Sequence, residues 1–184
     1  MEKQRIDDFI NFLRCNFTQD IESVDNTIKE IINDESKEYL LYLIEILTEY
    51  INMNINNKDK IRLIKENVSI YYENEIDYLM LIYKILKEIK YSLKIEKLLR
   101  QIDIVIKELE GKYFNEINND EVVGLIYKRY KNALEIIKSN KDINKLFIIG
   151  GVRAYMDVYS DYDNAILGEM YKAEKINKEL IMYK

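Results

Sequence analysis

The side chains in this sequence that could do chemistry are mainly carboxylates, because histidine is absent and Cys15 is the only cysteine. Without histidine we expect no Ser-His-Asp or Cys-His nucleophile, no histidine-ligated zinc or di-iron site, and no phosphohydrolase centre with histidine ligands. One cysteine also excludes an intramolecular disulfide. The catalytic class that stays open is a magnesium site made of carboxylates alone, so the spacing of Asp and Glu is examined first.

Glu35 and Glu38 form a Glu-x-x-Glu pair that places two carboxylates one helical turn apart. Helical nucleotide pyrophosphatases also contain such a pair, but they need a downstream Glu-x-x-Asp pair, and none follows position 38. We therefore interpret the pair as a solvated helix start.

A second acidic group consists of Asp157, Asp161 and Asp163. Ser160 predicts a helix boundary inside this group, and acidic residues in a first turn complement the helix dipole. The segment also lacks the glycine and the final glutamate of an EF-hand. A carboxylate-only metal site near Asp157 and Asp161 stays an alternative, but we expect no metal, no cofactor and no enzymatic activity.

The formal charge of −5 is unevenly distributed along the sequence. Residues 1–55 carry five basic and twelve acidic side chains, a balance of −7. An acidic surface of this kind steers association with a basic protein and can occupy a groove that normally holds nucleic acid. The residues that we expect to form the protein-binding surface are Asp34, Glu35, Glu38, Glu45 and Glu49.

The alternative binding surface is a basic ridge on one predicted helix. Its lysines fall within an arc of about 80° and extend over roughly 15 Å. Such a ridge can follow a phosphate backbone, which would make the protein a nucleic-acid-associated regulator. The acidic pI of about 5.1 and the interrupting Glu88 and Glu96 argue against it. The lysines are Lys87, Lys90, Lys94 and Lys97.

The elements that must position these residues are all predicted to be helices. Proline is absent, glycine occurs five times, and Leu, Ile, Lys and Glu recur at spacings of three and four. The stretch 38–55 is apolar on most sides and is predicted to be the helix around which the others pack; 76–89 is the second candidate. Further helices are expected over 5–17, 20–32, from Ile61 to about Tyr72, from about 118–121 onward, over 143–159, and from about Ser160 to Tyr183. The segment 76–110, which ends before Gly111, is expected to form one long bent helix or two helices.

Three local features complete the prediction. Ser36 is expected to cap the helix that begins at Glu38, and 111–119 is expected to be the longest loop. Gly150-Gly151 lacks the strand and lysine of a phosphate loop. We interpret Gly150 with Ala154 as a pair of small residues, one turn apart in a helix, that lets a neighbouring helix approach closely.

The sequence thus predicts a compact all-α bundle of seven or eight helices that forms one domain over 1–184. No signal-peptide pattern or membrane-length apolar run is found, so we expect a cytoplasmic protein without membrane association. The expected function is a non-catalytic protein-binding module, such as a stoichiometric inhibitor or an immunity or counter-defence factor carried by a phage or mobile element. The expected partner is a basic nucleic-acid-binding protein, and the last helix could also form a homodimer seam.

Overall fold

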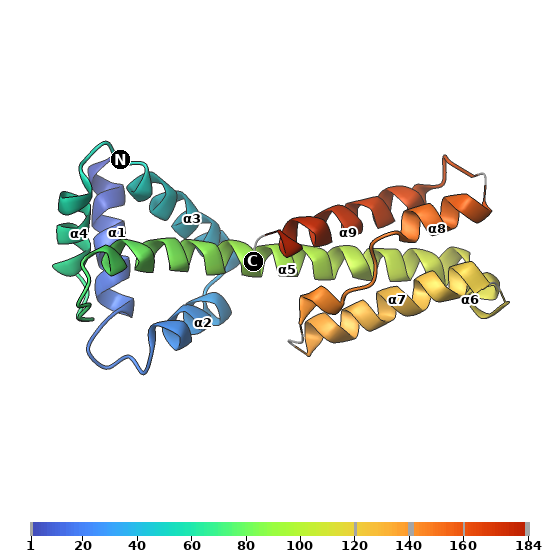
Figure 1. Ribbon diagram of the computed structural model, residues 1–184, viewed down its shortest axis with the longest axis horizontal. Coiled ribbons are helices and arrows are strands. Elements are labelled where there is room, and N and C mark those ends of the chain that lie inside the picture. The colour runs from blue at the N-terminus through green and yellow to red at the C-terminus, as the bar shows by residue number, and fades with distance from the viewer. Residues whose placement is uncertain (1, 120, 140–141, 160, 183–184) are drawn as a thin grey trace. The chain divides into compact units, whose positions relative to one another are not determined.

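A computed structural model of the chain describes residues 2–119, 121–139, 142–159 and 161–182, and all regular elements in these ranges are helices (Figure 1). Nine α-helices occur there, and eight of them are longer than six residues. The predicted all-α multi-helix bundle is therefore confirmed. The chain divides into two compact units, residues 1–92 (unit 1) and residues 93–184 (unit 2). The single domain over 1–184 stays a prediction.

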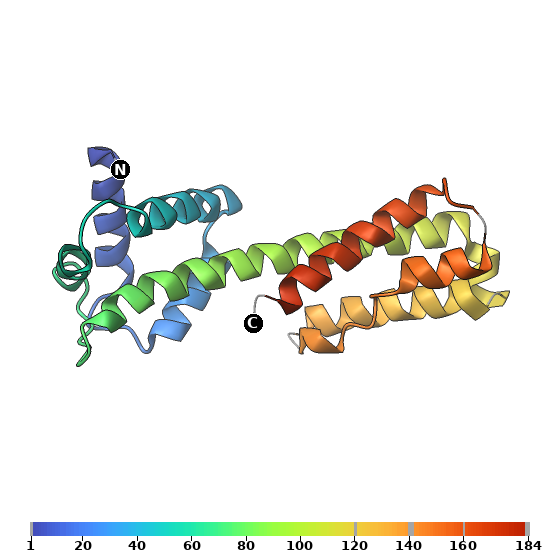
Figure 2. The ribbon, with the colours of Figure 1, turned by 45° about the horizontal axis from the view of Figure 1, so that its top comes forward.

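Unit 1 contains four helices and the first part of a fifth (Figures 1 and 2). Its core is rich in aromatic side chains: the rings of Phe9 and Tyr50 stack with their centroids 4.1 Å apart, and both are buried. The Tyr50 hydroxyl donates to the Lys60 carbonyl at 2.6 Å, so its polar end is satisfied. The helices are α1 (Lys3–Asn16), α2 (Val24–Asp34), α3 (Lys37–Ile51), α4 (Asn57–Lys65) and the start of α5 (Ile76–Lys112).

Three helices of unit 1, α2, α3 and α4, are capped by the residue that directly precedes them. The predicted cap of α3 is confirmed, because the backbone N–H of Tyr39 donates to Ser36 Oγ at 3.2 Å. Ser23 and Asn56 accept the corresponding N–H groups of α2 and α4. Each cap satisfies a donor that the helix itself cannot pair, which fixes where the helix begins.

The prediction for 38–55 was wrong in length and in burial. The helix α3 ends at Ile51 because a turn at Asn52 follows, and Asn56 already caps α4. Its buried residues lie on one side, whereas Leu41 is 47% exposed. The surplus of apolar residues on α3 therefore does not make it a helix buried all round.

Unit 2 contains the rest of α5 and four further α-helices, with the second half of α5, α7 and α9 running alongside one another (Figures 1 and 2). Side chains on α5 reach both neighbours: Gln101 donates to the Glu169 carboxylate at 2.7 Å, and Tyr127 donates to Glu110 at 2.7 Å. The elements are α6 (Phe114–Asn119), α7 (Glu121–Lys138), the 3₁₀ turn η1 (Ile143–Lys145), α8 (Gly151–Val158) and α9 (Ala165–Ile181).

Two predictions for unit 2 need correction. The segment 111–119 is not a long loop, because α5 continues to Lys112 and α6 begins at Phe114. The helix predicted over 143–159 is interrupted: η1 ends at Lys145 and α8 begins only at Gly151. Gly150 has φ +92°, a left-handed conformation that suits glycine and cannot lie inside a helix.

The close helix approach predicted for Gly150 and Ala154 is made by Gly151 instead. A Cβ atom at Gly151 would lie 3.0 Å from Met170 Cε on α9, so a larger residue would require the end of the Met170 side chain to shift. The predicted boundary residue Ser160 lies outside the described residues, and the observed cap of α9 is Asn164. In the described part of the chain, no helix is long and apolar enough to cross a membrane.

Candidate protein-binding surface

Five of the acidic residues of unit 1 line a hollow between the end of α1, the loop after it and α2. Asn26, Glu30 and Asp34 share one face of α2 because they stand four residues apart. The loop after α1 contributes Asp20 and Glu22 to the lining of the hollow, whose volume is about 430 Å³. Five exposed carboxylates line this hollow: Asp20, Glu22, Glu30, Asp34 and Glu35.

A second hollow of about 360 Å³ adjoins the first, since Asn16 and Glu35 line both. It lies between α1 and α3 and adds Asp8 together with Tyr39 and Tyr42. The Tyr42 hydroxyl donates to Asp8 at 2.5 Å, and this hydrogen bond raises the pKa of Tyr42. Burial, followed by the charge of Glu35, raises the pKa of Tyr39. We call the two hollows together the acidic surface.

The acidic surface has the charge of a binding site for cations, but not the geometry of a metal centre. Among the described residues that line the two hollows there are six carboxylates and neither lysine nor arginine. Yet no group of three or more Cys, Asp or Glu side chains in the described ranges is placed to hold a metal ion. The carboxylates are spread over a face, an arrangement that suits several lysine or arginine side chains of a protein.

The structure divides the five predicted binding residues into two groups. Asp34 and Glu35 line the acidic surface, and Glu38 is exposed at the start of α3 close by in the sequence. Glu45 and Glu49 lie two and three turns further along α3, where the guanidinium of Arg5 forms ion pairs with both. Their charge is partly neutralised inside the chain, so the first group offers the stronger attraction to a basic partner.

The predicted lysine ridge is distributed over both units. Lys87 and Lys90 belong to unit 1 and Lys94 and Lys97 to unit 2, all on α5. Lys94 forms an ion pair with Glu179 on α9, with 3.2 Å between nitrogen and oxygen. That lysine therefore helps to hold α9 against α5.

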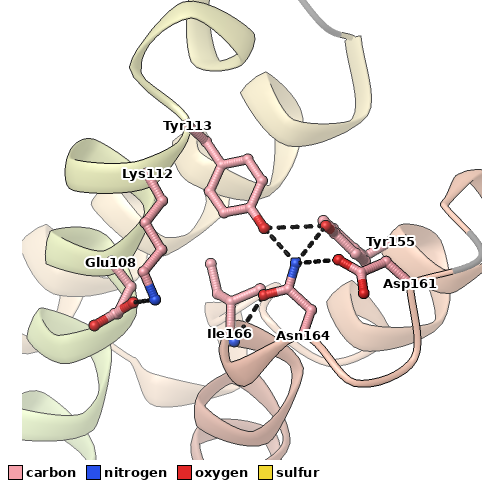
Figure 3. A network of polar contacts seen from close by, with 7 residues as sticks. All are labelled: Glu108, Lys112, Tyr113, Tyr155, Asp161, Asn164 and Ile166. Atoms are coloured by element: carbon pink, nitrogen blue, oxygen red, sulfur yellow. Dashed lines mark hydrogen bonds and ion pairs between the residues drawn. The ribbon is translucent and has the colours of Figure 1, made fainter.

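A polar network joins three elements of unit 2 at their ends (Figure 3). The amide nitrogen of Asn164 donates to the hydroxyls of Tyr113 and Tyr155, the latter at 2.9 Å, and to Asp161 Oδ2 at 2.8 Å. The two hydroxyls are themselves 3.2 Å apart. The amide oxygen accepts the N–H of Ile166 at 3.2 Å and so caps α9. One side chain thus connects the end of α5, α8 and the start of α9.

The chemistry of this network is structural. Burial and the hydrogen bond with Tyr113 raise the pKa of Tyr155, so its phenol stays protonated at neutral pH and does not serve as a base. The Asn164 nitrogen has two hydrogens for three acceptors. The nearby Asp157 lies apart from the network, with its carboxylate 3.8 Å from Arg153.

A buried carboxylate performs a similar task at the start of α8. This helix has no side-chain cap of its own, since Gly150 precedes it. Glu174, a buried residue of α9, accepts the backbone N–H of Val152 at 2.9 Å. Its negative charge also complements the positive end of the α8 dipole. Sequence spacing does not reveal this cap, because Glu174 lies 22 residues away.

The fold and its surfaces define a small all-helical protein of two units, and a comparison with known proteins concerns the second unit. The profile of a family described as YeeD uncharacterised protein matches residues 92–182, which nearly coincide with unit 2. The protein named "Uncharacterized protein YeeD" from Bacillus subtilis (strain 168) is 35% identical over 94 residues. This match covers 46% of the present chain and 89% of the relative.

The chain therefore belongs to the YeeD family. The family model matches residues 92–182, so the acidic surface lies outside the matched residues. No solved structure matches the chain significantly.

Proposed function

We propose that the protein is a non-catalytic binding module that acts by occupying a basic surface on another protein. The single observation that carries the proposal is the composition of the acidic surface, six carboxylates without a lysine or arginine among the described residues that line it. Oppositely charged surfaces accelerate encounter and select partners, which suits a stoichiometric inhibitor.

Tyr39 and Tyr42 support a protein as the partner. Both line the acidic surface and are partly exposed, and tyrosine is a favoured interface residue because it combines a large contact area with a polar tip. The Asp8 carboxylate holds the Tyr42 hydroxyl at 2.5 Å, so this ring is already oriented before a partner arrives. A basic protein that normally binds nucleic acid is the partner that this combination fits best.

The first experiment is an affinity pull-down of the tagged full chain from a lysate of its native host, at low and high salt and after nuclease treatment. Under the proposal, one protein is retained after nuclease treatment and released by high salt. If that protein is a nuclease, the immunity or counter-defence form of the proposal is supported. Recovery of nucleic acid alone at low salt would favour the Lys87 to Lys97 ridge instead.

The retained protein is then tested against two full-chain variants of equal charge. The double variant Asp34→Lys, Glu35→Lys reverses two charges of the acidic surface and is expected to weaken binding about a hundredfold. The control is Glu66→Lys, Glu73→Lys, which changes the net charge equally at exposed positions outside both hollows. Equal affinity of the two variants would reject the acidic surface as the contact.

A further inference from the structure

The outer face of α7 in unit 2 carries two hollows that follow each other along the helix. The first, of about 520 Å³, lies between α6 and the N-terminal half of α7. The second, of about 650 Å³, lies between α7, the segment after η1 and the end of α9. Lys128 lines both hollows, so they form one continuous feature, which we call the α7 groove.

The α7 groove has the length of a short helix. Leu125, Lys128 and Asn132 line it and stand three and four residues apart, so they form one strip along α7. From Glu121, at the other end of the groove, to Asn132 the strip rises by roughly 17 Å at 1.5 Å per residue. A partner helix of about three turns spans the same distance.

Large exposed apolar side chains line the groove. Leu125 is 48% exposed, Phe147 66% and Ile181 40%. Phe147 and Ile149 alternate with Leu146 and Ile148, which are both buried in the core of unit 2. The buried pair therefore fixes the segment while Phe147 and Ile149 face the groove, and grouped exposed apolar side chains of this kind are typical of protein-binding sites.

The charge of the second hollow indicates the chemistry of the groove's occupant, since the first hollow carries Glu121 beside Lys128 and is balanced. Lys128 and Arg129 line the second hollow, and none of the described residues that line it is acidic. This is the opposite of the acidic surface of unit 1. Apolar walls flanked by cations suit an amphipathic segment that carries carboxylates beside its apolar face.

We propose that the α7 groove binds an acidic amphipathic helix of a partner protein. Apolar side chains of that helix, spaced by three and four residues, contact Leu125 and Phe147, and its carboxylates pair with Lys128 and Arg129. The site goes beyond the proposed function, because it lies in unit 2 and selects the opposite charge. It also lies within residues 92–182, the part of the chain that matches the YeeD family.

The test is a selection from a fully randomised library of 18-residue peptides displayed on phage, with the full chain as bait. Enriched peptides are expected to contain apolar residues at helical spacing and an excess of Asp and Glu. Their affinity, measured by fluorescence anisotropy, should fall at least tenfold with Phe147→Ser and with Lys128→Glu, Arg129→Glu. All the altered side chains line the α7 groove. Circular dichroism verifies that each variant keeps its helix content.

Matched controls lie on the exposed side of α9, outside the groove: Tyr171→Ser for the apolar change and Lys175→Glu, Lys178→Glu for the charge change. Both should bind the selected peptides as the unaltered chain does. The proposal is overturned if no peptide is enriched, if enriched peptides are basic, or if controls and groove variants bind equally. Binding to phosphatidylglycerol vesicles that requires Phe147 and Lys128 would identify a membrane surface instead and would also overturn it.

Discussion

The two units of the chain begin their helices in different ways. In unit 1, Ser23, Ser36 and Asn56 each cap the helix that directly follows them. In unit 2, Glu174 caps α8 from another helix, and Asn164 caps α9 while it also binds two tyrosines from elsewhere in the sequence. The starts of α2, α3 and α4 are therefore specified locally, whereas the start of α8 depends on packing against α9, and the local cap of α9 is tied to tyrosines from other elements.

The units also differ in charge and in what their surfaces offer. Residues 1–92 carry 12 basic and 18 acidic side chains, a balance of −6, whereas residues 93–184 carry 16 and 15, a balance of +1. The acidic surface of unit 1 and the apolar, basic α7 groove of unit 2 are thus complementary to different partners. The YeeD family model matches only residues of unit 2 and Ser92 beside it. The part of the chain shared with the family is therefore distinct from the acidic part.

The strongest test of this comparison removes one buried tyrosine from each unit. Tyr50→Ala and Tyr130→Ala should each lower the free energy of unfolding by about 3–5 kcal/mol, because both rings are almost fully buried. Hydrogen exchange of the full chain shows where protection is lost. We expect the loss from Tyr130→Ala to be concentrated in α7, α8 and α9; an equal loss in α1 to α4 would show that the chain unfolds as the single domain predicted from the sequence.

A second test concerns the cap that α9 supplies to α8. Glu174→Ala should lower the free energy of unfolding by about 2 kcal/mol, because it removes a charged acceptor and leaves the partly buried N–H of Val152 unpaired. Glu174→Gln keeps an oxygen at this position and should cost clearly less. Urea denaturation measures both values, and equal losses for the two variants would contradict the capping role.

Alkaline pH should affect both units through their buried tyrosines. Burial raises the pKa of Tyr50 and of Tyr130 far above the ordinary value of 10.0, so the folded state keeps protons that the unfolded state releases. The stability from these groups is complete below about pH 10 and is lost as pH rises from there towards the folded-state pKa. At about pH 11 each tyrosine accounts for a loss of about 1.4 kcal/mol. Urea denaturation below about pH 10 and at about pH 11 measures the loss of unfolding free energy between the two. We expect this loss to be smaller in Tyr130→Phe than in the unaltered chain; an equal loss would contradict its assignment to the buried tyrosine.

The smallest expected effect is the difference between two caps. Ser36→Ala removes one local hydrogen bond and should cost about 1 kcal/mol. Asn164→Ala removes a cap and also the bonds to Tyr113 and Tyr155, so it should cost about 1 kcal/mol more. Asn164→Ser keeps an oxygen that can cap α9 but removes the amide N–H groups that contact the tyrosines, so it separates the cap from the tyrosine contribution. If the two alanine variants lose the same stability by thermal denaturation, the network adds nothing to the cap.

Several features of unit 1 were predictable from the residue order. The spacing of apolar residues predicted the helices, Ser36 predicted the start of α3, and the charge count placed the acidic surface in the first third of the sequence. These features depend on residues within one or two turns of each other. The structure separates the predicted binding residues into those at the acidic surface and those paired with Arg5. This separation was not predictable, because the ion pairs of Arg5 with Glu45 and Glu49 join residues 40 and 44 positions apart.

The sequence by itself determined that the protein is helical, that it lacks histidine chemistry, and where its negative charge lies, because composition and periodicity are local properties. Only the tertiary structure decided that α8 begins at Gly151, that Glu174 and Asn164 hold the helix ends of unit 2, and that Leu125 and Phe147 face one groove. These features join side chains that are distant in the sequence. Their energies come from burial and from hydrogen bonds formed across the folded chain, which no window of neighbouring residues contains.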